Sequence, residues 1–269
     1  MIKYLIFCLY VLFLLNIGTY TYYRTETNGK AKLKIRKAAK DGETMTYCLP
    51  GLKSTPDSAF KFQERATIHE DIVMTGGITY VYYEDSGFNP KTIAKQIVLD
   101  IKEHHYRPII ISVSVGDQIA RYLEQEIDDL SIIAINPAPN NECLKCDVLT
   151  LLTIKCVIKN FILASIGWLG QLRLIKTDGK TRQSLNLVLD MENCLIRSNL
   201  EVTTKATKAV ILSQYDKLLE NPDVYDIFCH ANSNVKIIKV ATDHANLSIG
   251  SILYRDRIAD IFKTVYKLP

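Results

Sequence analysis

The sequence has little excess charge of either sign. Its 33 lysine and arginine residues are balanced by 29 aspartate and glutamate residues, which leaves a net charge of +4. A protein that binds nucleic acid needs clustered basic side chains in clear excess, so we expect no nucleic-acid partner. Seven cysteines in 269 residues are too sparse for a disulfide scaffold. With 48% hydrophobic residues and no low-complexity stretch, the composition indicates an ordinary globular domain.

What the sequence does contain is an uncharged N-terminal stretch, residues 4–23, which reads YLIFCLYVLFLLNIGTYTYY. Roughly 20 apolar residues in a helix span the hydrocarbon core of a bilayer. Lys3 would also suit the start of a secretory signal, but no A-x-A-like cleavage site follows. We therefore predict an uncleaved transmembrane anchor in residues 1–24, with a cleaved signal peptide as the alternative.

Basic residues follow this stretch, and we interpret residues 25–43 as a linker. Because positive flanks stay on the cytoplasmic side of a membrane, the balance of charge favours a cytoplasmic main domain. The same flank could instead lie on anionic lipid headgroups or simply be solvated. The basic residues concerned are Arg24, Lys30, Lys32, Lys34, Arg36, Lys37 and Lys40.

The rest of the chain alternates between short strands and longer helices. The predicted strands are rich in Ile, Val and Tyr, and several are apolar at consecutive positions, as in residues 109–111. Continuous apolarity indicates strands covered on both faces, as in a parallel sheet. We therefore predict a doubly wound α/β domain. Its predicted strands are residues 45–49, 79–83, 108–113, 131–136, 209–213 and 235–241, and its helices are residues 90–105, 118–127 and 258–266.

One segment, residues 140–205, interrupts this alternation and is mostly helical in pattern. It divides the α/β core into residues 44–139 and 206–269. Its apolar run is interrupted by Lys155 and Lys159, each of which would cost about 2.5–3.5 kcal/mol inside a membrane, so we predict a helical cap over the sheet rather than a second span. The apolar side chains near its centre could line an acyl-chain pocket or face a membrane, but plain packing of the cap is favoured. These are Phe161, Ile162, Leu163, Ile166, Trp168 and Leu169.

The most informative motif is S-x-S-x-G at residues 112–116, where a buried strand passes directly into a helix. A nucleophile elbow has this layout, because small residues two positions before and after the central serine let the turn close. Ser114 is therefore the candidate nucleophile. The usual motif begins with glycine, whereas this one begins with Ser112, the smallest departure that carries a side chain.

With this motif the chain resembles the α/β-hydrolase family from about residue 45 to the C-terminus. The resemblance implies a catalytic acid and a histidine on the loops after the last two strands, in that order. Asp216 and His244 occupy these positions, and the predicted cap falls where the family commonly inserts one. Glu220 and Asp223 are substitutes for the acid, whereas His230 precedes the last strand and is a weaker competitor.

The resemblance also implies an oxyanion hole formed by two backbone N–H groups. The first belongs to Val115, directly after the nucleophile. The second, by position, belongs to Leu52 in the loop after strand 45–49. Families of this type often have a histidine in that loop where this chain has Pro50.

From these residues we expect a membrane-anchored serine hydrolase that cleaves carboxylic esters or related acyl compounds, with a small acyl or lipid-like substrate and no cofactor. His244 would take the proton of Ser114 and Asp216 would orient the imidazole. Acyl transfer to an acceptor other than water uses the same residues. The alternative from another class is a catalytically silent α/β-hydrolase-fold protein that serves as a binding or scaffold module.

Cys143-x-x-Cys146 has the spacing of a zinc or redox pair. No second pair or matching histidine follows it, and a lone pair is more often without function, so we expect no metal site. A redox or metal protein centred on this pair is the third hypothesis, and a disulfide would be possible in an exported domain.

Overall fold

The computed structural model describes residues 4–11, 14, 29–52, 76–84, 87–171, 179–198, 200, 203, 205–219, 221–231, 235–244 and 254–266. Side chains of residues 159–186 are outside this description, so the six apolar cap residues, whether they pack the cap or line an acyl-chain pocket, are not among the side chains described. Most of the predicted anchor, residues 4–23, also lies outside it, although residues 4–11 are helical and exposed. Within the described ranges, no helix combines the length and the apolarity needed to cross a bilayer.

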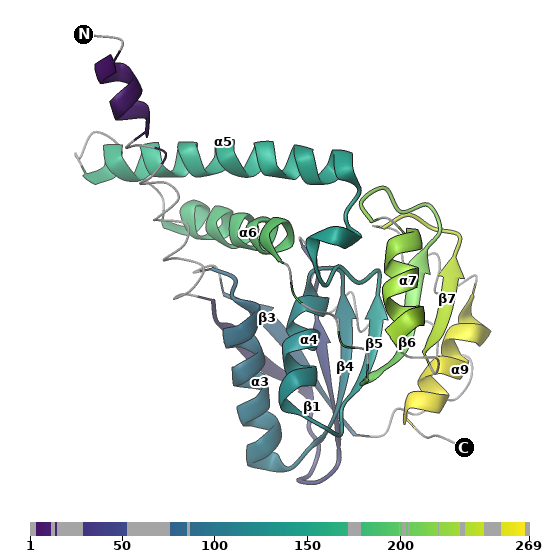
Figure 1. Cartoon of the computed structure of the whole chain (residues 1–269). Coiled ribbons are helices and arrows are strands. Elements are labelled where there is room, and N and C mark those ends of the chain that lie inside the picture. Colours follow the sequence, from purple (N-terminus) through teal and green to yellow (C-terminus); the bar gives the residue numbers. More distant parts are fainter. Residues whose placement is uncertain are drawn as a thin grey trace.

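A seven-stranded, mostly parallel sheet forms the centre of the molecule (Figure 1), which confirms the α/β part of the predicted fold class. The strand order is β1-β3-β2-β4-β5-β6-β7, and the antiparallel pair is β1 with β3. The strands are β1 Ala31–Lys37, β2 Thr44–Leu49, β3 Gly77–Tyr83, β4 Arg107–Val113, β5 Ser131–Ile135, β6 Thr207–Ser213 and β7 Lys236–Val240.

Strand β1 corrects the sequence analysis, which assigned residues 25–43 to a linker. Lysines and apolar residues alternate along β1, and the exposed side chain of Lys32 and the half-buried side chain of Leu33 lie on opposite faces. This two-residue period is typical of a strand at a sheet edge, where one face meets solvent. The basic residues of this segment are compatible with a linker, but they are equally compatible with an edge strand.

Both faces of the sheet are covered, because neighbouring residues of the central strands point into different hydrophobic clusters. Ile110 of β4 belongs to the larger cluster, together with residues of the helices α3, α4 and α7. Ile109 and Ile111 belong to a second cluster with α9. Figure 1 shows α9 apart from the other three helices. These helices are α3 Pro90–His104, α4 Gly116–Glu126, α7 Asn221–Ala231 and α9 Arg255–Tyr266.

The chain between β5 and β6 contains the short η1 Asn141–Cys143 and two long helices, α5 Cys146–Gln171 and α6 Gly179–Arg197. The two long helices lie side by side beyond the ends of β4 and β5 (Figure 1). These helices lie within residues 140–205, the segment for which a helical insertion was predicted.

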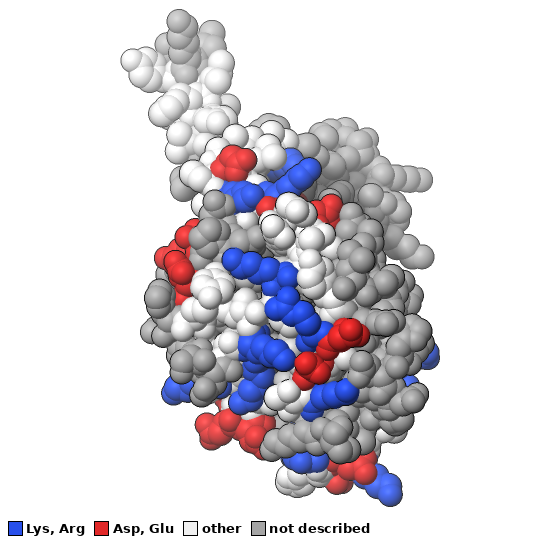
Figure 2. Space-filling view, turned by 90° about the vertical axis from the view of Figure 1, so that its right-hand side faces the viewer, with Lys and Arg blue, Asp and Glu red and all other residues white. Residues whose placement is uncertain are grey.

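Lysine side chains also line the opposite sheet edge, strand β7. Lys236 and Lys239 are exposed there, and the Lys239 ammonium lies 5.0 Å from the centre of the Tyr225 ring. Figure 2, which views this side of the molecule, shows Lys and Arg side chains gathered on the surface. Lysines on an edge strand disfavour pairing with a second sheet, because their charges would have to be buried.

Candidate active site

Ser114 lies in the turn between β4 and α4 and has a positive φ of 51°. This conformation is strained for a residue with a side chain, and such strain is concentrated at functional sites. Hydrogen bonds from both sides hold the turn: the Ser114 N–H donates to Ile135 O at 3.0 Å, and its carbonyl accepts from Asp117 N at 3.0 Å and Ala138 N at 3.1 Å. The serine is therefore fixed at the end of the strand by its own backbone.

Gly116 shows why the turn needs a residue without a side chain. A Cβ at this position would lie 2.8 Å from the carbonyl oxygens of both Leu49 and Pro50. These backbone atoms cannot move independently of β2, so a larger residue would push apart the elbow and the loop after β2. The close approach also places that loop directly beside the start of α4.

Ser112, the departure from the usual elbow motif, has a partner of its own. Its buried hydroxyl donates a hydrogen bond to Asp117 Oδ1 at 2.9 Å, and the same carboxylate oxygen is 3.0 Å from Arg121 Nη2. A glycine would leave that hydroxyl position empty next to a buried carboxylate. The presence of Ser112 in place of glycine is therefore explained by its hydrogen bond to Asp117 in the first turn of α4.

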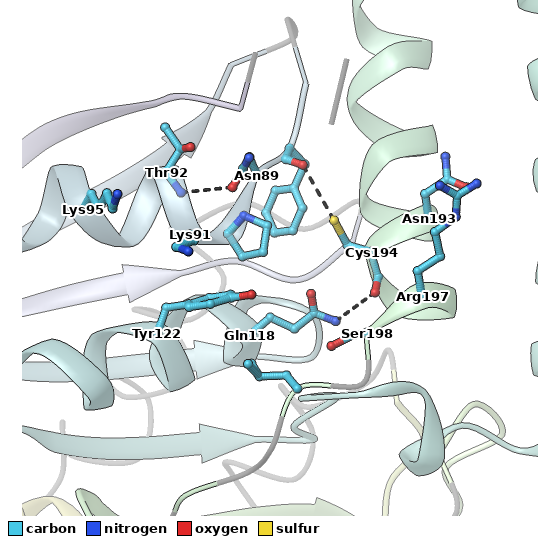
Figure 3. Close-up of a pocket in the computed structure, with 13 residues that line it drawn as sticks. Asn89, Lys91, Thr92, Lys95, Gln118, Tyr122, Asn193, Cys194, Arg197 and Ser198 are labelled. Atoms are coloured by element: carbon cyan, nitrogen blue, oxygen red, sulfur yellow. Dashed lines mark hydrogen bonds between the residues drawn. The ribbon is translucent and has the colours of Figure 1, made fainter. Parts of the chain in front are cut away.

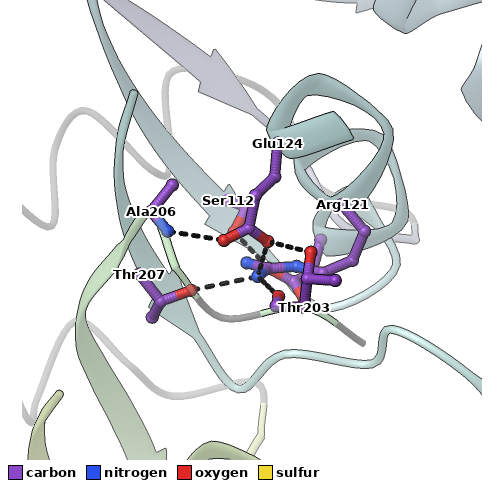
Figure 4. Close-up of polar contacts among 7 residues, drawn as sticks. Ser112, Arg121, Glu124, Thr203, Ala206 and Thr207 are labelled. Carbon is purple, nitrogen blue, oxygen red and sulfur yellow. Dashed lines mark hydrogen bonds and ion pairs between the residues drawn. The ribbon is translucent and has the colours of Figure 1, made fainter. Parts of the chain in front are cut away.

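Arg121 is the centre of a buried polar cluster (Figure 4). Its Nη1 donates to Glu124 Oε2 at 2.8 Å, to Thr203 O at 2.7 Å and to Thr207 Oγ1 at 3.0 Å. Glu124 in turn accepts from Thr203 Oγ1 and from the backbone N–H of Ala206. The cluster therefore joins α4 to the segment that leads into β6.

This cluster was not predicted from the sequence. Asp117, Arg121 and Glu124 are spaced four and three residues apart, which places them on one face of α4. That face also carries the buried apolar residues Ala120 and Leu123 close by. Charged residues at core-facing positions of α4 indicate a buried ion-pair network, and this pattern is present in the sequence.

The three residues predicted for catalysis lie together in the structure. His244 Nε2 is 3.1 Å from Ser114 Oγ, and His244 Nδ1 is 2.6 Å from Asp216 Oδ2. Both distances are within hydrogen-bond range. The three residues come from the ends of β4, β6 and β7 and form one continuous chain of hydrogen bonds. Asp223, the described substitute for the acid, is exposed in α7, while Glu220 and the His230 side chain lie outside the described residues.

Asp216 is held as a carboxylate on both of its oxygens. Oδ1 accepts hydrogen bonds from the backbone N–H groups of Leu218 and Leu219, at 2.8 and 3.0 Å. Burial alone would raise the pKa of this carboxyl, but the hydrogen bond and charge of His244, with the two backbone donors, lower the pKa below its usual value. The turn is further fixed by Lys145, whose Nζ donates to Asp216 O at 2.8 Å.

A second polar cluster ties together the strand ends that carry these residues. Asn136, directly after β5, donates from Nδ2 to Ser213 Oγ at 2.8 Å and accepts from Ser213 N at 2.7 Å. Ser213 Oγ is also 3.1 Å from Thr242 Oγ1. Asn136 itself has a positive φ of 44°, which asparagine tolerates better than most residues. The cluster sets the separation of the loops that hold Asp216 and His244.

The candidate oxyanion-hole residues lie on either side of the elbow. Val115 directly precedes α4, and Leu52 is in the loop after β2. Tyr83 stabilises this loop by donating its hydroxyl to Pro50 O at 2.9 Å. In the part of the chain that the structure describes, the backbone N–H groups of Val115 and Leu52 have no hydrogen-bond acceptor.

The cysteine pair has no shared partner. Cys143 is buried and donates to Asn140 Oδ1 at 3.3 Å, whereas Cys146 is exposed, and both thiols are free. Burial raises the pKa of the Cys143 thiol to about 12, so the thiol is protonated and unreactive at neutral pH. No cluster of three or more His, Cys, Asp or Glu residues suited to a metal occurs among the described residues.

Solved structures of esterases and hydrolases share this fold. An alpha/beta hydrolase enzyme from a Medee basin deep-sea metagenome library superposes with a TM-score of 0.57 at 12% identity, covering 86% of this chain and 94% of its own. A thermophilic esterase from Thermogutta terrifontis gives 0.55 at 9% identity, covering 88% and 94%. A structure reported with carboxylesterases of Nitrososphaera gargenis gives 0.54 at 12% identity, covering 88% and 95%.

No protein-family model and no curated protein sequence matches this chain. The structural similarity nevertheless extends over most of both chains in each comparison. The protein therefore has the α/β-hydrolase fold.

Proposed function

We propose that this protein is a serine hydrolase that cleaves carboxylic esters or related acyl compounds through Ser114, His244 and Asp216. The observation that carries the proposal is the unbroken hydrogen-bond chain from Ser114 Oγ through the imidazole to Asp216 Oδ2, with distances of 3.1 and 2.6 Å. A strained, positive-φ serine at the start of a helix belongs to the same arrangement.

The roles follow from the hydrogen bonds. An ionised Asp216 accepts a hydrogen bond from His244 Nδ1, which leaves the lone pair of Nε2 facing Ser114 Oγ. His244 Nε2 can then take the hydroxyl proton as Oγ attacks the substrate carbonyl carbon. The resulting imidazolium lies against the Asp216 carboxylate, whose lowered pKa keeps it charged.

The backbone N–H groups of Val115 and Leu52 are the proposed donors to the oxyanion that forms on the substrate. His244 returns its proton to the leaving group, and an acyl-enzyme remains on Ser114. Water activated by the same imidazole then releases the acid and regenerates the serine. An alcohol or amine in place of water would give acyl transfer with the same residues.

We infer a small acyl or lipid-like ester as substrate. Several proteins of the same fold are named esterases, among them a marine microorganism esterase and the Thermogutta terrifontis esterase. The apolar composition of residues 148–169 in the cap favours an apolar acyl group. Hydrolysis of p-nitrophenyl esters of increasing chain length would establish the preferred acyl length directly.

Labelling by a fluorophosphonate probe tests the catalytic proposal. The full-length protein should be labelled, and Ser114→Ala should not be. Ser131→Ala, at the start of β5 and away from the site, is the matched control and should label like the parent. Absence of labelling in folded parent protein would favour the catalytically silent scaffold instead.

We further propose that residues 4–23 attach the protein to a membrane, on the sequence argument alone. The main domain would then face the cytoplasm because of the basic residues that follow. Alkaline carbonate should leave the full-length protein in the membrane pellet and release a variant that lacks residues 2–24. Recovery of the full-length protein in the soluble fraction would contradict attachment.

A further inference from the structure

A cavity of about 530 Å³ lies between the N-terminal end of α3, the helix α4 and the C-terminal part of α6. We call it the α3–α6 cavity. Figure 3 shows Lys91 and Lys95 of α3 on one side and Asn193 and Arg197 of α6 on the other, with Gln118 of α4 between them. Ser114, Asp216 and His244 are not among the residues that line it. The cavity is therefore distinct from the proposed catalytic site.

The α3–α6 cavity is surrounded by positive charge. Lys91, Lys95 and Arg197 line it, and among its described lining residues there is no aspartate or glutamate. Within the described part of the chain these three cations form no ion pair. The Asp190 carboxylate does not line the cavity, but it lies behind its wall and accepts a hydrogen bond from the N–H of the lining residue Phe88 at 3.3 Å. An anion that enters the cavity would therefore meet three positive charges and no carboxylate among the described lining residues.

The position of the lysines on α3 is unfavourable for the helix itself. The first turn of a helix prefers acidic residues because the backbone N–H groups there carry partial positive charge. The first turn of α3 has no acidic residue, and Lys91 occupies it instead. Lys95 is four residues further on, so the two like charges are neighbours on the helix surface. The N–H groups of Thr92 and Ile93 already donate to Asn89, and Pro90 has no N–H, so a bound anion would mainly offset the repulsion between the two lysines.

The side chain of Asn193 is a second, independent observation that points to a ligand in this cavity. Its side chain lines the cavity and is only 4% exposed, yet its amide nitrogen Nδ2 has no hydrogen-bond partner in the described structure. A buried donor without an acceptor is costly, and such groups are rare in folded proteins. Nδ2 can only donate, so the partner that satisfies it must be a hydrogen-bond acceptor.

We propose that the α3–α6 cavity binds an anionic ligand through a phosphate group. A phosphate monoester carries close to two negative charges and several acceptor oxygens, which suits the two lysines, the arginine and the amide donor of Asn193 that line the cavity. The volume is within the roughly 300–1,000 Å³ of small-molecule sites, so the phosphate would be attached to a larger organic group. A soluble phosphate ester and a phospholipid headgroup share this chemistry.

Calorimetric titration of the full-length protein in detergent with inorganic phosphate tests the proposal. The double substitution Lys91→Gln/Lys95→Gln should weaken phosphate binding at least about tenfold, because charged hydrogen bonds are lost. Both lysines are exposed, so the variant should fold. Asn193→Asp keeps the shape but adds a negative charge and should abolish binding. Two control variants should bind like the parent: Lys102→Gln, at the other end of α3, and Ser114→Ala.

Two results would overturn the proposal: no binding of phosphate at millimolar concentration, or equal affinity in the parent and in both cavity variants. Because Ser114→Ala is expected to bind normally, failure here would not bear on the catalytic proposal. The same titration in nanodiscs of phosphatidylcholine, with and without phosphatidic acid, distinguishes a phospholipid headgroup from a soluble phosphate ester as the ligand. Competition by phosphatidic acid in the parent would identify a lipid headgroup, and unchanged phosphate binding would identify a soluble ester.

Discussion

The exchange Asp216→Asn tests the proposed mechanism most sharply, because it changes the charge of one side chain and little else. The amide oxygen can still accept from Leu218 and Leu219, as Oδ1 does now at 2.8 and 3.0 Å. The amide NH₂ would then face His244 Nδ1, which must become an acceptor. The imidazole proton would move to Nε2, where it blocks the lone pair needed by Ser114.

We expect the turnover number to fall by roughly 10⁴-fold. The corresponding Asp→Asn substitution in a chymotrypsin-like triad has an effect of this size, because the imidazole then adopts the wrong tautomer. The free energy of unfolding of Asp216→Asn should fall by only about 1.5–3 kcal/mol, because one charge-assisted hydrogen bond is lost while both backbone hydrogen bonds remain. Asp216→Ala, which also removes those two acceptor contacts, should lose about 1–3 kcal/mol more. Ester hydrolysis and urea unfolding of the three proteins measure both effects.

The pH dependence of stability gives a second readout for the same residue. The folded-state pKa of Asp216 is lowered, so its contribution to stability is complete above the unfolded pKa of about 3.9 and is lost as the pH falls through the folded value. The stability difference between the parent and Asp216→Asn should therefore shrink below about pH 4. Turnover of the Asn variant near that of the parent would refute the assigned role of Asp216.

Three further substitutions probe the elbow and its support. Gly116→Ala should destabilise the fold by about 1–3 kcal/mol in thermal unfolding and lower turnover, since its Cβ would meet two backbone carbonyls at 2.8 Å; a neutral result would contradict the close approach. Arg121→Met should cost about 3–5 kcal/mol in urea unfolding, because Asp117 and Glu124 would be buried without a cation. Ser112→Gly should lose about 0.5–3 kcal/mol and retain activity; loss of labelling in the folded variant would show that Ser112 does more than support Asp117.

The central strands and the candidate nucleophile could be predicted because their signals are local. Ile109 to Ile111 form an apolar run that suits a strand covered on both faces, and the S-x-S-x-G motif lies where strand becomes helix. Because β4, β5, β6 and β7 pair in parallel, the carboxyl ends of β4, β6 and β7 lie at one edge of the sheet. Asp216 and His244 follow these strands, and they were chosen because the resemblance to the α/β-hydrolase family implies an acid and a histidine at these positions.

What sequence reasoning missed depends on contacts between distant segments. Asn136 gave no signal of its own, because its partner Ser213 is 77 residues away and belongs to another strand. Strand β1 was misinterpreted because its lysines, which face solvent at a sheet edge, were counted as charge and not as one half of an alternating pattern. Nothing in the local sequence of either segment specifies the neighbour that it contacts.

The Arg121 cluster connects the nucleophile to the end of the cap. Ser112 at the elbow contacts Asp117, Asp117 contacts Arg121, and Arg121 and Glu124 hold Thr203 and Ala206, where the chain returns from the cap to β6. β6 then leads directly to Asp216. One buried charged cluster thus fixes the strand that carries the serine against the strand that carries the acid. A hydrophobic contact at the same place would fill the volume but would fix the relative position of the two strands less closely, because dispersion is less directional than a charged hydrogen bond.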